Sequence, residues 1–434
     1  MKVLHISISD GGGAGVAAVR LHEALLGSGV DSKLLTLQKN SDSIQEHYLF
    51  SKVDAARFRS VSIVMSYVDR ILKRFKLKSD YYRTQWRDSM DGRPKGHRLF
   101  NFTISEYHLE MHPLVKEADI IHLHWVCGGF LDFKGFFTKV SKKVVWTLHD
   151  MNPFTGGCHY ANECDGYMKD CHTCPQLEGT ADLSIAKKML SQKIKVLNDR
   201  REGLSIVTPS KWLMECSRQS ALFRSYKHQH IYNVVAGEEC YLTNKAASRN
   251  NLSIPLDKKV VLCIASFTDL RKGNMLLLGA LDLMAEKNVL LCSVGGMTDE
   301  LKDNSSVLQL GYIKDRSKMR DVYNAADVFV LPSMADNFPN TVVESLRCGT
   351  PVVAFNVGGI PEQITEHNGI LVEERSEQSL AAALDKFFGN QHAYNREAIS
   401  KEASDRYDVD GVVSEHLDLY RSLEVDSSSV DALN

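Results

Sequence analysis

The sequence has 434 residues, enough for two or three domains at about 150 residues per domain. Its hydrophobic share of 44% is ordinary for a globular protein, and its formal net charge of -2 gives no general attraction for nucleic acid or anionic lipid. No stretch approaches the roughly 18 consecutive apolar residues that span a bilayer, and the N-terminal MKVLHISISDGGG has no signal-peptide pattern. These properties exclude an integral membrane protein and favour a cytoplasmic one.

The first half of the chain alternates short β-branched runs with helical segments, which is typical of a parallel α/β domain. Val3–Ser9 is a predicted strand, Asp10–Gly15 a glycine-rich turn and Val16–Leu26 a helix. The further strand candidates are Ser32–Leu37, Ile120–His124, Lys143–His149 and Ser205–Pro209.

After Asn233 the same pattern begins again. It opens with the strand Lys259–Ala265, a turn that contains Arg271, Lys272 and Gly273, and the helix Asn274–Met284. The later strand candidates are Val289–Val294, Ser306–Leu310, Val328–Leu331 and Pro351–Phe355. Two such series predict two Rossmann-like domains with the ligand site in the cleft between them. The expected bounds are 1–233 and 234–409, with a crossover helix at about 410–424 that belongs to the first domain and a disordered tail at 425–434.

A basic segment, Lys52–Arg98, interrupts the first series. It contains 13 Lys or Arg and 5 Asp, a local net charge of +8 in a chain that totals -2. Within it, Val61–Lys78 alternates apolar and basic positions at helical spacing. Two interpretations stay open: a solvated helical insertion, or a basic amphipathic surface that contacts anionic lipid or an anionic acceptor.

The stretch Leu331–Phe355, LPSMADNFPNTVVESLRCGTPVVAF, carries the most chemical information. A predicted strand ends at Leu331, and after a short loop a helix begins near Asn340 and ends at Gly349. The start of a helix offers unpaired N–H groups and the positive end of the helix dipole, so it suits a phosphate group.

Four side chains of this stretch fit a bound nucleotide. Asn340 and Thr341 can donate hydrogen bonds to phosphate, and Glu344, one turn further, can accept hydrogen bonds from a ribose diol. Asp336 precedes the helix, where it could accept hydrogen bonds from sugar hydroxyls. From spacing alone, an acidic residue at such a place is more often a helix cap than a ligand.

The same stretch resembles the Glu-x7-Glu motif of retaining GT-B glycosyltransferases, specifically glycosyltransferase family 4, with Asp336 in place of the first Glu. The flanking runs AADVFVLPS (Ala325–Ser333) and GTPVVAFNVGGIPE (Gly349–Glu362) strengthen the resemblance, which is strongest from about Val260 to Val372. It implies the GT-B fold, with two Rossmann-like domains whose parallel sheets face each other across a cleft.

The resemblance also implies a function. Exopolysaccharide and O-antigen members of the family transfer a hexose-type sugar from a UDP- or GDP-linked donor to a polysaccharide or lipid-linked oligosaccharide, with retention, at the cytoplasmic face of the membrane. The implied mechanism is front-face substitution, in which the leaving phosphate takes the proton of the acceptor and no catalytic metal is needed.

Residue roles follow from the resemblance position by position. In the loop IASFTDLRKG, Lys272 matches the second of two basic positions that neutralise the diphosphate, Ser266 stands where many members have Arg, and Arg271 is the candidate to compensate. His149 stands where the family has a histidine beside the sugar, and His124 is a weaker candidate of the same kind. The implied catalytic residues are Asp336, Lys272, His149 and Glu344, and the implied residues of the sugar-donor site are Gly12, Gly13, Ser266, Arg271, Lys272, Asn337, Phe338, Pro339, Asn340, Thr341 and Glu344.

Gly11–Gly15 resembles the glycine loop of the family, whose backbone approaches the phosphate of the sugar donor. A glycine loop after a strand is also typical of dinucleotide binding. The spacing Gly-x-Gly-x-x-Gly is absent here because Val16 occupies its last position, which makes an NAD-dependent oxidoreductase a distant alternative.

A cysteine-rich segment follows His149. Cys158, Cys164, Cys171 and Cys174 have the spacing C-x5-C-x6-C-x2-C, with His159 and His172 between them. Three interpretations stay open: a structural zinc site with four thiolates or with one of these histidines, reduced thiols in a packed loop, and a disulfide or redox function.

Two further functions remain compatible with the sequence. One is a synthase of the same fold that acts on a small acceptor, and the other is an inactive scaffold or binding member of the family. The departures at Asp336 and Ser266 are the reason to consider the second.

Overall fold

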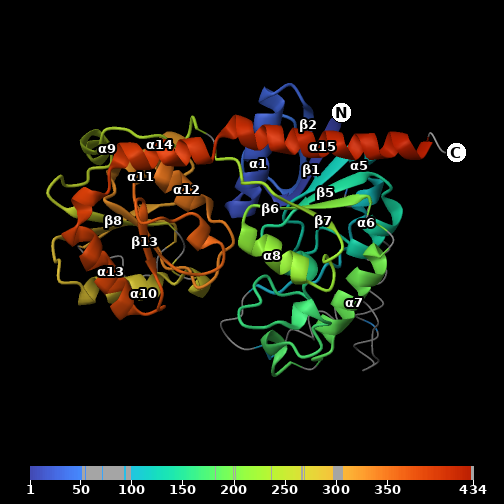
Figure 1. Cartoon of the computed structure of the whole chain (residues 1–434), viewed down its shortest axis with the longest axis horizontal. Coiled ribbons are helices and arrows are strands. Elements are labelled where there is room, and N and C mark those ends of the chain that lie inside the picture. Colours follow the sequence, from blue (N-terminus) through green and yellow to red (C-terminus); the bar gives the residue numbers. More distant parts are fainter. Residues whose placement is uncertain are drawn as a thin grey trace. The chain divides into compact units, whose positions relative to one another are not determined.

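The computed structural model describes residues 1–50, 54, 71, 92–93, 99–180, 182–198, 200, 202–235, 237–264, 267, 269–296 and 306–431. The chain forms two compact units, Met1–Ile231 with Val413–Asn434, and Tyr232–Val412 (Figure 1). The basic segment 52–98 lies outside the described residues apart from Asp54, Ile71, Gly92 and Arg93. Among the described helices, none is long and apolar enough to cross a membrane.

The first unit contains a seven-stranded parallel sheet in the order β3-β2-β1-β4-β5-β6-β7. Its strands are β1 (Lys2–Ser9), β2 (Asp31–Gln38), β3 (His47–Leu49), β4 (Ile120–Leu123), β5 (Lys143–Thr147), β6 (Leu204–Thr208) and β7 (Lys227–His230). The direction in which successive strands are added reverses between β1 and β4. The expected α/β fold of this half is therefore confirmed.

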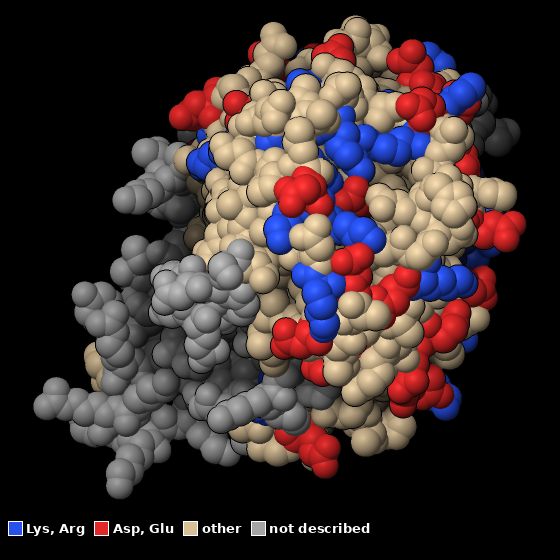
Figure 2. Space-filling view, turned by 90° about the vertical axis from the view of Figure 1, so that its left-hand side faces the viewer, with Lys and Arg blue, Asp and Glu red and all other residues tan. Residues whose placement is uncertain are grey.

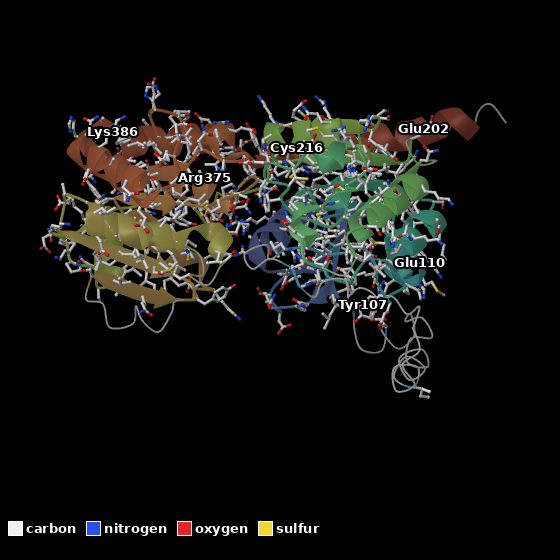
Figure 3. All side chains as sticks on the ribbon, turned by 90° about the horizontal axis from the view of Figure 1, so that it is seen from below. Tyr107, Glu110, Glu202, Cys216, Arg375 and Lys386 are labelled. Carbon is white, nitrogen blue, oxygen red and sulfur yellow. The ribbon has the colours of Figure 1, made fainter. Side chains whose placement is uncertain are left out.

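Helices cover this sheet, and aromatic residues fill the core between the two layers. The helices are α1 (Gly12–Gly27), α5 (Pro113–Glu117), α6 (Phe133–Lys139), α7 (Ile185–Leu197) and α8 (Lys211–Gln219), with the short 3-10 helices η1 (Leu109–Met111), η2 (Asn152–Phe154), η3 (Gly166–Met168) and η4 (Pro175–Leu177). Trp146 of β5 is almost fully buried and packs against Phe137 of α6, with ring centroids 5.8 Å apart. Glu110 of η1, labelled in Figure 3, is buried, and its Oε1 pairs with Lys139 Nζ at the end of α6 at 2.9 Å.

Helix α1 begins four residues earlier than the sequence predicts. Its first residue is Gly12, with φ +70°, so most of the predicted glycine turn is helical. Gly15 lies inside the helix, where a Cβ atom would be 2.4 Å from the carbonyl oxygen of Ser9. The glycines therefore allow the first turn of α1 to pack closely on the end of β1, and this packing outweighs their low helix propensity.

The second unit contains a six-stranded parallel sheet in the order β10-β9-β8-β11-β12-β13. Its strands are β8 (Lys259–Ile264), β9 (Val289–Val294), β10 (Val307–Gly311), β11 (Val328–Leu331), β12 (Val352–Phe355) and β13 (Gly369–Val372). Its helices are α9 (Lys245–Asn251), α10 (Asn274–Leu283), α11 (Arg316–Ala325), α12 (Asn340–Arg347), α13 (Glu377–Gly389) and α14 (Arg396–Arg406), with the 3-10 helices η5 (Leu270–Lys272), η7 (Ile360–Glu362) and η8 (Gln391–Ala393).

Both faces of this second sheet are buried. Along β8, Val260 and Leu262 belong to one apolar cluster together with Leu346 of α12. Val261 and Cys263 belong to a different cluster, which contains Leu277 of α10. A continuous apolar strand is expected where helices cover both faces of a parallel sheet.

The last helix, α15 (Val409–Asp431), supplies the C-terminal segment of the first unit. Tyr420 of this helix is fully buried, and its hydroxyl oxygen lies 2.6 Å from His122 Nδ1 of β4. The sequence predicts that this helix ends at about residue 424 and that 425–434 is a disordered tail. In the structure the helix continues to Asp431.

Charge is mixed over the molecular face that Figure 2 shows. Lys and Arg side chains form a band through the middle of this face, and Asp and Glu side chains lie beside and among them. Mixed signs at close range agree with the small net charge of the chain.

Candidate functional site

Two neighbouring strands of the second unit bring the predicted phosphate and sugar residues together. β8 pairs with β11 in parallel, with Val261 opposite Val328, and the strand order reverses between these two strands. Ligands of open parallel sheets bind beyond the carboxyl ends of the strands at such a reversal. The loop after β8 carries Arg271 and Lys272, and the loop after β11 carries Asp336.

Lys272 and Asp336 form an ion pair across these two loops. Lys272 Nζ donates to Asp336 Oδ2 at 2.7 Å, and Arg271 Nη1 lies 3.5 Å from the same oxygen. Burial raises the pKa of the Asp336 carboxyl, but the charges of Lys272 and Arg271 outweigh this effect and hold the pKa below its usual value. Asp336 is therefore a carboxylate at neutral pH, with two cations beside it.

Backbone contacts hold the two loops at this distance. The Met334 N–H donates to the Arg271 carbonyl at 2.7 Å, and Arg271 Nη1 donates to the Ala335 carbonyl at 2.8 Å. Gly273 has φ +65°, and a Cβ atom there would be 1.9 Å from the carbonyl oxygen of Pro332. Only glycine fits this close approach, so Gly273 fixes where Lys272 lies.

The loop from Asn337 to Pro339 links Asp336 to helix α12. Asn337 is buried, and its N–H donates to Asp336 Oδ1 at 3.1 Å. The Phe338 ring is buried against Tyr232, 5.4 Å away between centroids, and against Tyr407 at 5.9 Å. Pro339 is the N-cap residue of α12 and provides no side-chain cap. The structure thus places the Phe338 side chain in the core.

Helix α12 carries the three residues predicted to bind the nucleotide. Its first residue, Asn340, is buried and accepts a hydrogen bond from Asn233 Nδ2 at 2.9 Å through Oδ1. Thr341 and Glu344 are half-buried. Tyr323 of α11 donates its hydroxyl hydrogen to Glu344 Oε2 at 2.6 Å. Burial and the Glu344 charge raise the pKa of Tyr323 well above its usual value, so the phenol stays protonated.

Tyr323 is a site residue that the sequence does not reveal. It lies in an ordinary helical pattern 21 positions before Glu344, and no motif singles it out. Ser266, the position that departs from the family pattern, lies outside the described residues.

In the first unit, the predicted glycines lie at the carboxyl end of β1. A Cβ atom built on Gly12 or on Gly13 would meet no atom within 4 Å, so their backbone borders open space. Asp10, just before them, is buried and accepts hydrogen bonds from the N–H groups of Asn40 and Ser41 at 2.9 Å. It thereby ties the loop after β1 to the loop after β2.

His149 lies just after β5, and the structure brings it together with His124. His124 Nδ1 is 3.2 Å from His149 Nε2. Burial lowers the pKa of His149 to about 4, and burial also lowers the pKa of His124 well below 6.5. Both rings are therefore neutral at physiological pH.

Asp150, the residue after His149, has its own set of partners. Its Oδ2 accepts from Trp125 Nε1 at 2.7 Å and lies 2.6 Å from His159 Nδ1. His159 Nε2 is 2.8 Å from Asn101 Oδ1, so both of its ring nitrogens are already engaged. His159 is therefore a fully buried structural histidine and a poor alternative metal ligand.

The four cysteines of the segment after His149 are free thiols that line one cavity. Cys158 and Cys171 are buried, and burial raises the pKa of Cys171 to about 11. Among the described residues, the one group of three or more His, Cys, Asp or Glu ligand atoms within 4.8 Å of one another is a histidine group in the first unit. The four cysteines thus line one cavity, but no three of their sulfur atoms lie within 4.8 Å of one another.

Comparisons with known proteins agree with this architecture. The model of the family "Glycosyl transferases group 1" matches residues 258–390. The relative named as a colanic acid biosynthesis glycosyl transferase, WcaC of Escherichia coli K12, is 22% identical over 435 residues and covers 96% of this chain and 98% of its own. Several further curated relatives share 36–60% of their length with this chain.

Solved structures with the same fold cover almost the whole chain. Sucrose-phosphate synthase from Thermosynechococcus elongatus has a TM-score of 0.63 at 16% identity, and covers 98% of this chain and all of its own. Anabaena HepE, solved in complex with UDP and glucose, has a TM-score of 0.60 at 16% identity, with 97% and 100% coverage. The chain uses a nucleotide sugar, and it belongs to the group 1 retaining glycosyltransferases, glycosyltransferase family 4, which have the GT-B fold.

Proposed function

We propose that this enzyme transfers a hexose-type sugar from a UDP- or GDP-sugar to a polysaccharide or lipid-linked oligosaccharide, with retention of configuration. The observation that carries the proposal is the meeting of Arg271 and Lys272 with Asp336 at the strand-order reversal of the second unit. Full-length similarity to a relative named for colanic acid biosynthesis supports the polysaccharide acceptor.

In this proposal, the two cations stabilise the leaving nucleoside diphosphate. Lys272 Nζ carries three N–H bonds and uses one for Asp336. It can therefore contact a phosphate oxygen while it stays paired with the carboxylate. Negative charge grows on the diphosphate as the glycosidic bond breaks, and a fixed cation favours that transition state over the ground state.

The remaining predicted residues receive roles that fit their positions. Glu344 accepts hydrogen bonds from the ribose through the carboxylate that Tyr323 orients, and the start of α12 at Asn340 and Thr341 faces phosphate. Asp336 and the neutral His149 contact the transferred sugar. The front-face mechanism requires no further side-chain nucleophile.

The first unit contributes backbone as well as His149. Open space beside Gly12 and Gly13 gives a phosphate access to the start of α1. Because α1 begins at Gly12, its first N–H groups carry the positive end of the helix dipole.

A thermal-shift panel of UDP, GDP, ADP and their sugars tests the proposal. A ligand at 100 times its Kd stabilises the protein by about 2.7 kcal/mol, so one nucleotide class should raise Tm clearly above the others. The best sugar donor is then incubated with polysaccharide, lipid-linked and small sugar acceptors, and the linkage of the product is determined by NMR. Transfer to small sugar acceptors alone would identify a small-acceptor synthase, and donor binding without transfer or hydrolysis would identify a binding member.

We also propose contact with anionic membrane through the basic segment 52–98. The support is its local charge of +8, because polybasic segments gain about 1 kcal/mol per Lys or Arg near an anionic surface. Binding to vesicles with and without anionic lipid, at low and high salt, tests this. Equal binding to neutral and anionic vesicles at low salt would contradict it.

The last part of the proposal is a structural zinc held by Cys158, Cys164, Cys171 and Cys174. All four line one cavity, and four thiolates on Zn²⁺ would carry a net charge of -2. Zinc–sulfur bonds of about 2.3 Å require the sulfur atoms to draw closer together than in this structure.

One buried cation, Lys193, and one half-buried cation, Arg93, lie close enough to these cysteines to supply the opposite charge. Lys193 of α7 is almost fully buried, and its Nζ donates to the carbonyls of Asn152 at 2.7 Å and Thr155 at 2.9 Å. Arg93 donates to the Gln176 carbonyl at 3.0 Å, and its Nη2 is buried with no hydrogen-bond partner. A buried cation needs an anion nearby, and a zinc–thiolate group would provide it.

Metal analysis of protein purified without chelator tests the zinc site. We expect about one zinc per chain, its loss in Cys171→Ser/Cys174→Ser, and its retention in Cys216→Ser, a half-buried cysteine outside the four. Absence of zinc both as purified and after incubation with zinc would show that the cysteines are simply packed thiols.

A further inference from the structure

A set of buried histidines occupies the core of the first unit. His5 of β1 lies opposite His122 of β4 in the strand register, and His124, just after the end of β4, stacks its ring on that of His122. His5 and His122 are fully buried and His124 is 3% exposed. The ring centroids of His122 and His124 are 4.4 Å apart, and those of His5 and His124 are 5.3 Å apart.

Hydrogen bonds link three of these rings in a line that ends at the proposed sugar site. His5 Nδ1 is 3.0 Å from His124 Nε2, and His124 Nδ1 is 3.2 Å from His149 Nε2. Burial lowers the pKa of each of the three rings, so each is neutral and carries one N–H. If His124 accepts at one nitrogen, it must donate at the other. The two hydrogen bonds therefore point in the same direction along the line.

The His5 ring, at the start of the line, indicates the direction in which these hydrogen bonds are donated. His5 Nε2 is buried and has no hydrogen-bond partner. In protein interiors a backbone N–H without a partner is rarer than an acceptor without one. The same reasoning applies to a ring nitrogen, so His5 Nε2 should carry no proton. His5 then donates from Nδ1 to His124, and His124 donates from Nδ1 to His149 Nε2. The His149 proton must then be on Nδ1.

A metal ion explains the same histidines less well. His5, His122 and His124 each offer a ring nitrogen within 4.8 Å of the others, which is a spacing that a metal ion could close. However, His122 Nδ1 is 2.6 Å from the Tyr420 hydroxyl and its Nε2 is 2.7 Å from Thr147 Oγ1. Both nitrogens of His124 are also engaged. Metal binding would have to break two of these contacts in a fully buried place, with no carboxylate in the group to offset the charge.

We propose that His5 and His124 are positioning residues for sugar transfer, which act by fixing the His149 proton on Nδ1. His149 then presents a hydrogen-bond donor to an oxygen of the bound sugar nucleotide, and its ring cannot turn without breaking the bond to His124. This inference rests on the proposed contact of His149 with the sugar. The closest parallel in general chemistry is the carboxylate or carbonyl that fixes the tautomer of a catalytic histidine through the opposite ring nitrogen.

Imidazole ¹⁵N shifts test the tautomer without reference to activity. In protein labelled with ¹⁵N-histidine, the His149 signals, identified by their loss in His149→Ala, should show a protonated Nδ1 and an unprotonated Nε2. His124→Phe removes the bond and should give mixed tautomers. His124→Gln, whose amide can accept from His5 and donate to His149, should restore the single tautomer. A wild-type His149 protonated on Nε2, or an unchanged tautomer in His124→Phe, would overturn the proposal. Zinc that copurifies with the wild-type protein and is lost when His5, His122 or His124 is replaced would overturn it as well.

A kinetic double-mutant cycle tests the functional consequence. We expect His124→Phe to lower kcat at least ~10-fold with little change in the KM for the sugar donor, and His124→Gln to recover most of it. In a His149→Ala background, His124→Phe should cost less than about 2-fold, because the two residues act as one unit. The matched control is His22→Phe, since His22 is equally buried but bonds to Ser32 and the Gln45 carbonyl, outside the line.

The two proposals fail in different ways. If His149→Ala keeps wild-type kcat and donor KM, the contact of His149 with the sugar is wrong, whatever the tautomer. If His149→Ala is impaired but His124→Phe is not, or if His124→Phe adds its full effect to His149→Ala, the positioning role is wrong and the sugar contact stands. Thermal unfolding of each variant shows that the comparison is made on folded protein.

Discussion

Lys272 Nζ lies 2.7 Å from Asp336 Oδ2, so the residue expected at the phosphate and the residue expected at the sugar are ion-paired with each other. Asp336 is one methylene shorter than the Glu of the family motif. The shorter side chain still reaches Lys272 because Gly273 and the backbone bond between Arg271 and Met334 draw the two loops together. The departure from the motif is thus accommodated by a close loop contact.

Removal of the Lys272 charge should weaken use of the sugar donor. We expect Lys272→Ala to lower kcat/KM for the nucleotide sugar at least ~10-fold, because about 1.4 kcal/mol of charge stabilisation is lost. Steady-state kinetics with varied sugar donor measures this. Lys287→Ala, which removes an exposed lysine of the same unit, is the control and should change kcat/KM by less than about 2-fold. Equal values for the two variants would show that the phosphate site lies elsewhere.

The negative charge of the Asp336 side chain should matter more for activity than the length of that side chain. Asp336→Glu keeps the charge and should retain activity within about 5-fold, whereas Asp336→Asn leaves Lys272 without its anion and should lower kcat at least ~10-fold. The kcat of both variants and their affinity for free nucleoside diphosphate are to be measured. Retained activity in Asp336→Asn would contradict a role of the carboxylate at the sugar.

Tyr323 should act on the nucleotide only through Glu344. Glu344→Ala removes the ribose acceptor and should weaken nucleotide binding at least ~10-fold by calorimetry. Tyr323→Phe removes one hydrogen bond of 2.6 Å and should weaken binding about 2- to 10-fold. In the double variant the effect of Tyr323→Phe should disappear. Glu366→Ala, at an exposed position, serves as the control.

Gly273→Ala should both destabilise the second unit and displace Lys272. The new Cβ would overlap the Pro332 carbonyl, 1.9 Å away, in addition to the cost of φ +65°. We expect a loss of about 1–3 kcal/mol in the free energy of unfolding and a weaker affinity for the nucleotide. Gly311→Ala separates the two effects, because Gly311 has the same φ with no atom within 4 Å of a Cβ. An equal loss in the free energy of unfolding for Gly273→Ala and Gly311→Ala would contradict a clash with the Pro332 carbonyl.

Acid should unfold the first unit through its buried histidines. Burial lowers the folded-state pKa of His5, His122 and His124 well below 6.5, and that of His149 to about 4. The unfolded chain takes up protons near pH 6.5 while the folded chain does not. Stability is therefore complete above about pH 6.5 and falls below it, by up to about 1.4 kcal/mol per pH unit for each histidine.

Chemical denaturation between pH 8 and pH 5 measures this loss. His22→Phe and His124→Phe each remove one buried histidine and should make the pH dependence shallower. A free energy of unfolding that does not change between pH 7 and pH 5 would contradict neutral histidines in the core.

The sequence predicted the strand series and the chemistry of the second unit because both depend on local pattern. β9 and β11 have the predicted bounds, since continuous apolar runs of this length mark buried parallel strands. The group 1 family and the GT-B fold are confirmed, because the motif from Asp336 to Glu344 and its flanks are specific.

Other features depend on contacts between distant parts of the chain and leave no local signal. β7 has the polar sequence KHQH at the edge of its sheet, and no alternation of apolar and polar residues marks it as a strand. The bonds from Tyr323 to Glu344 and from His5 to His124 join residues 21 and 119 positions apart. The early start of α1 at Gly12 likewise depends on packing against Ser9.

The bond between His122 and Tyr420 also has a consequence for synthesis of the chain. The second unit is one continuous stretch, Tyr232–Val412, but the first unit needs Val413–Asn434 as well. A ribosome adds about 5–20 residues per second. Roughly 15–60 s therefore pass between the synthesis of His122 and that of Tyr420, which is 298 positions later. Because Val413–Asn434 is made after the whole of Tyr232–Val412, the unit that is translated first is the unit that is completed last.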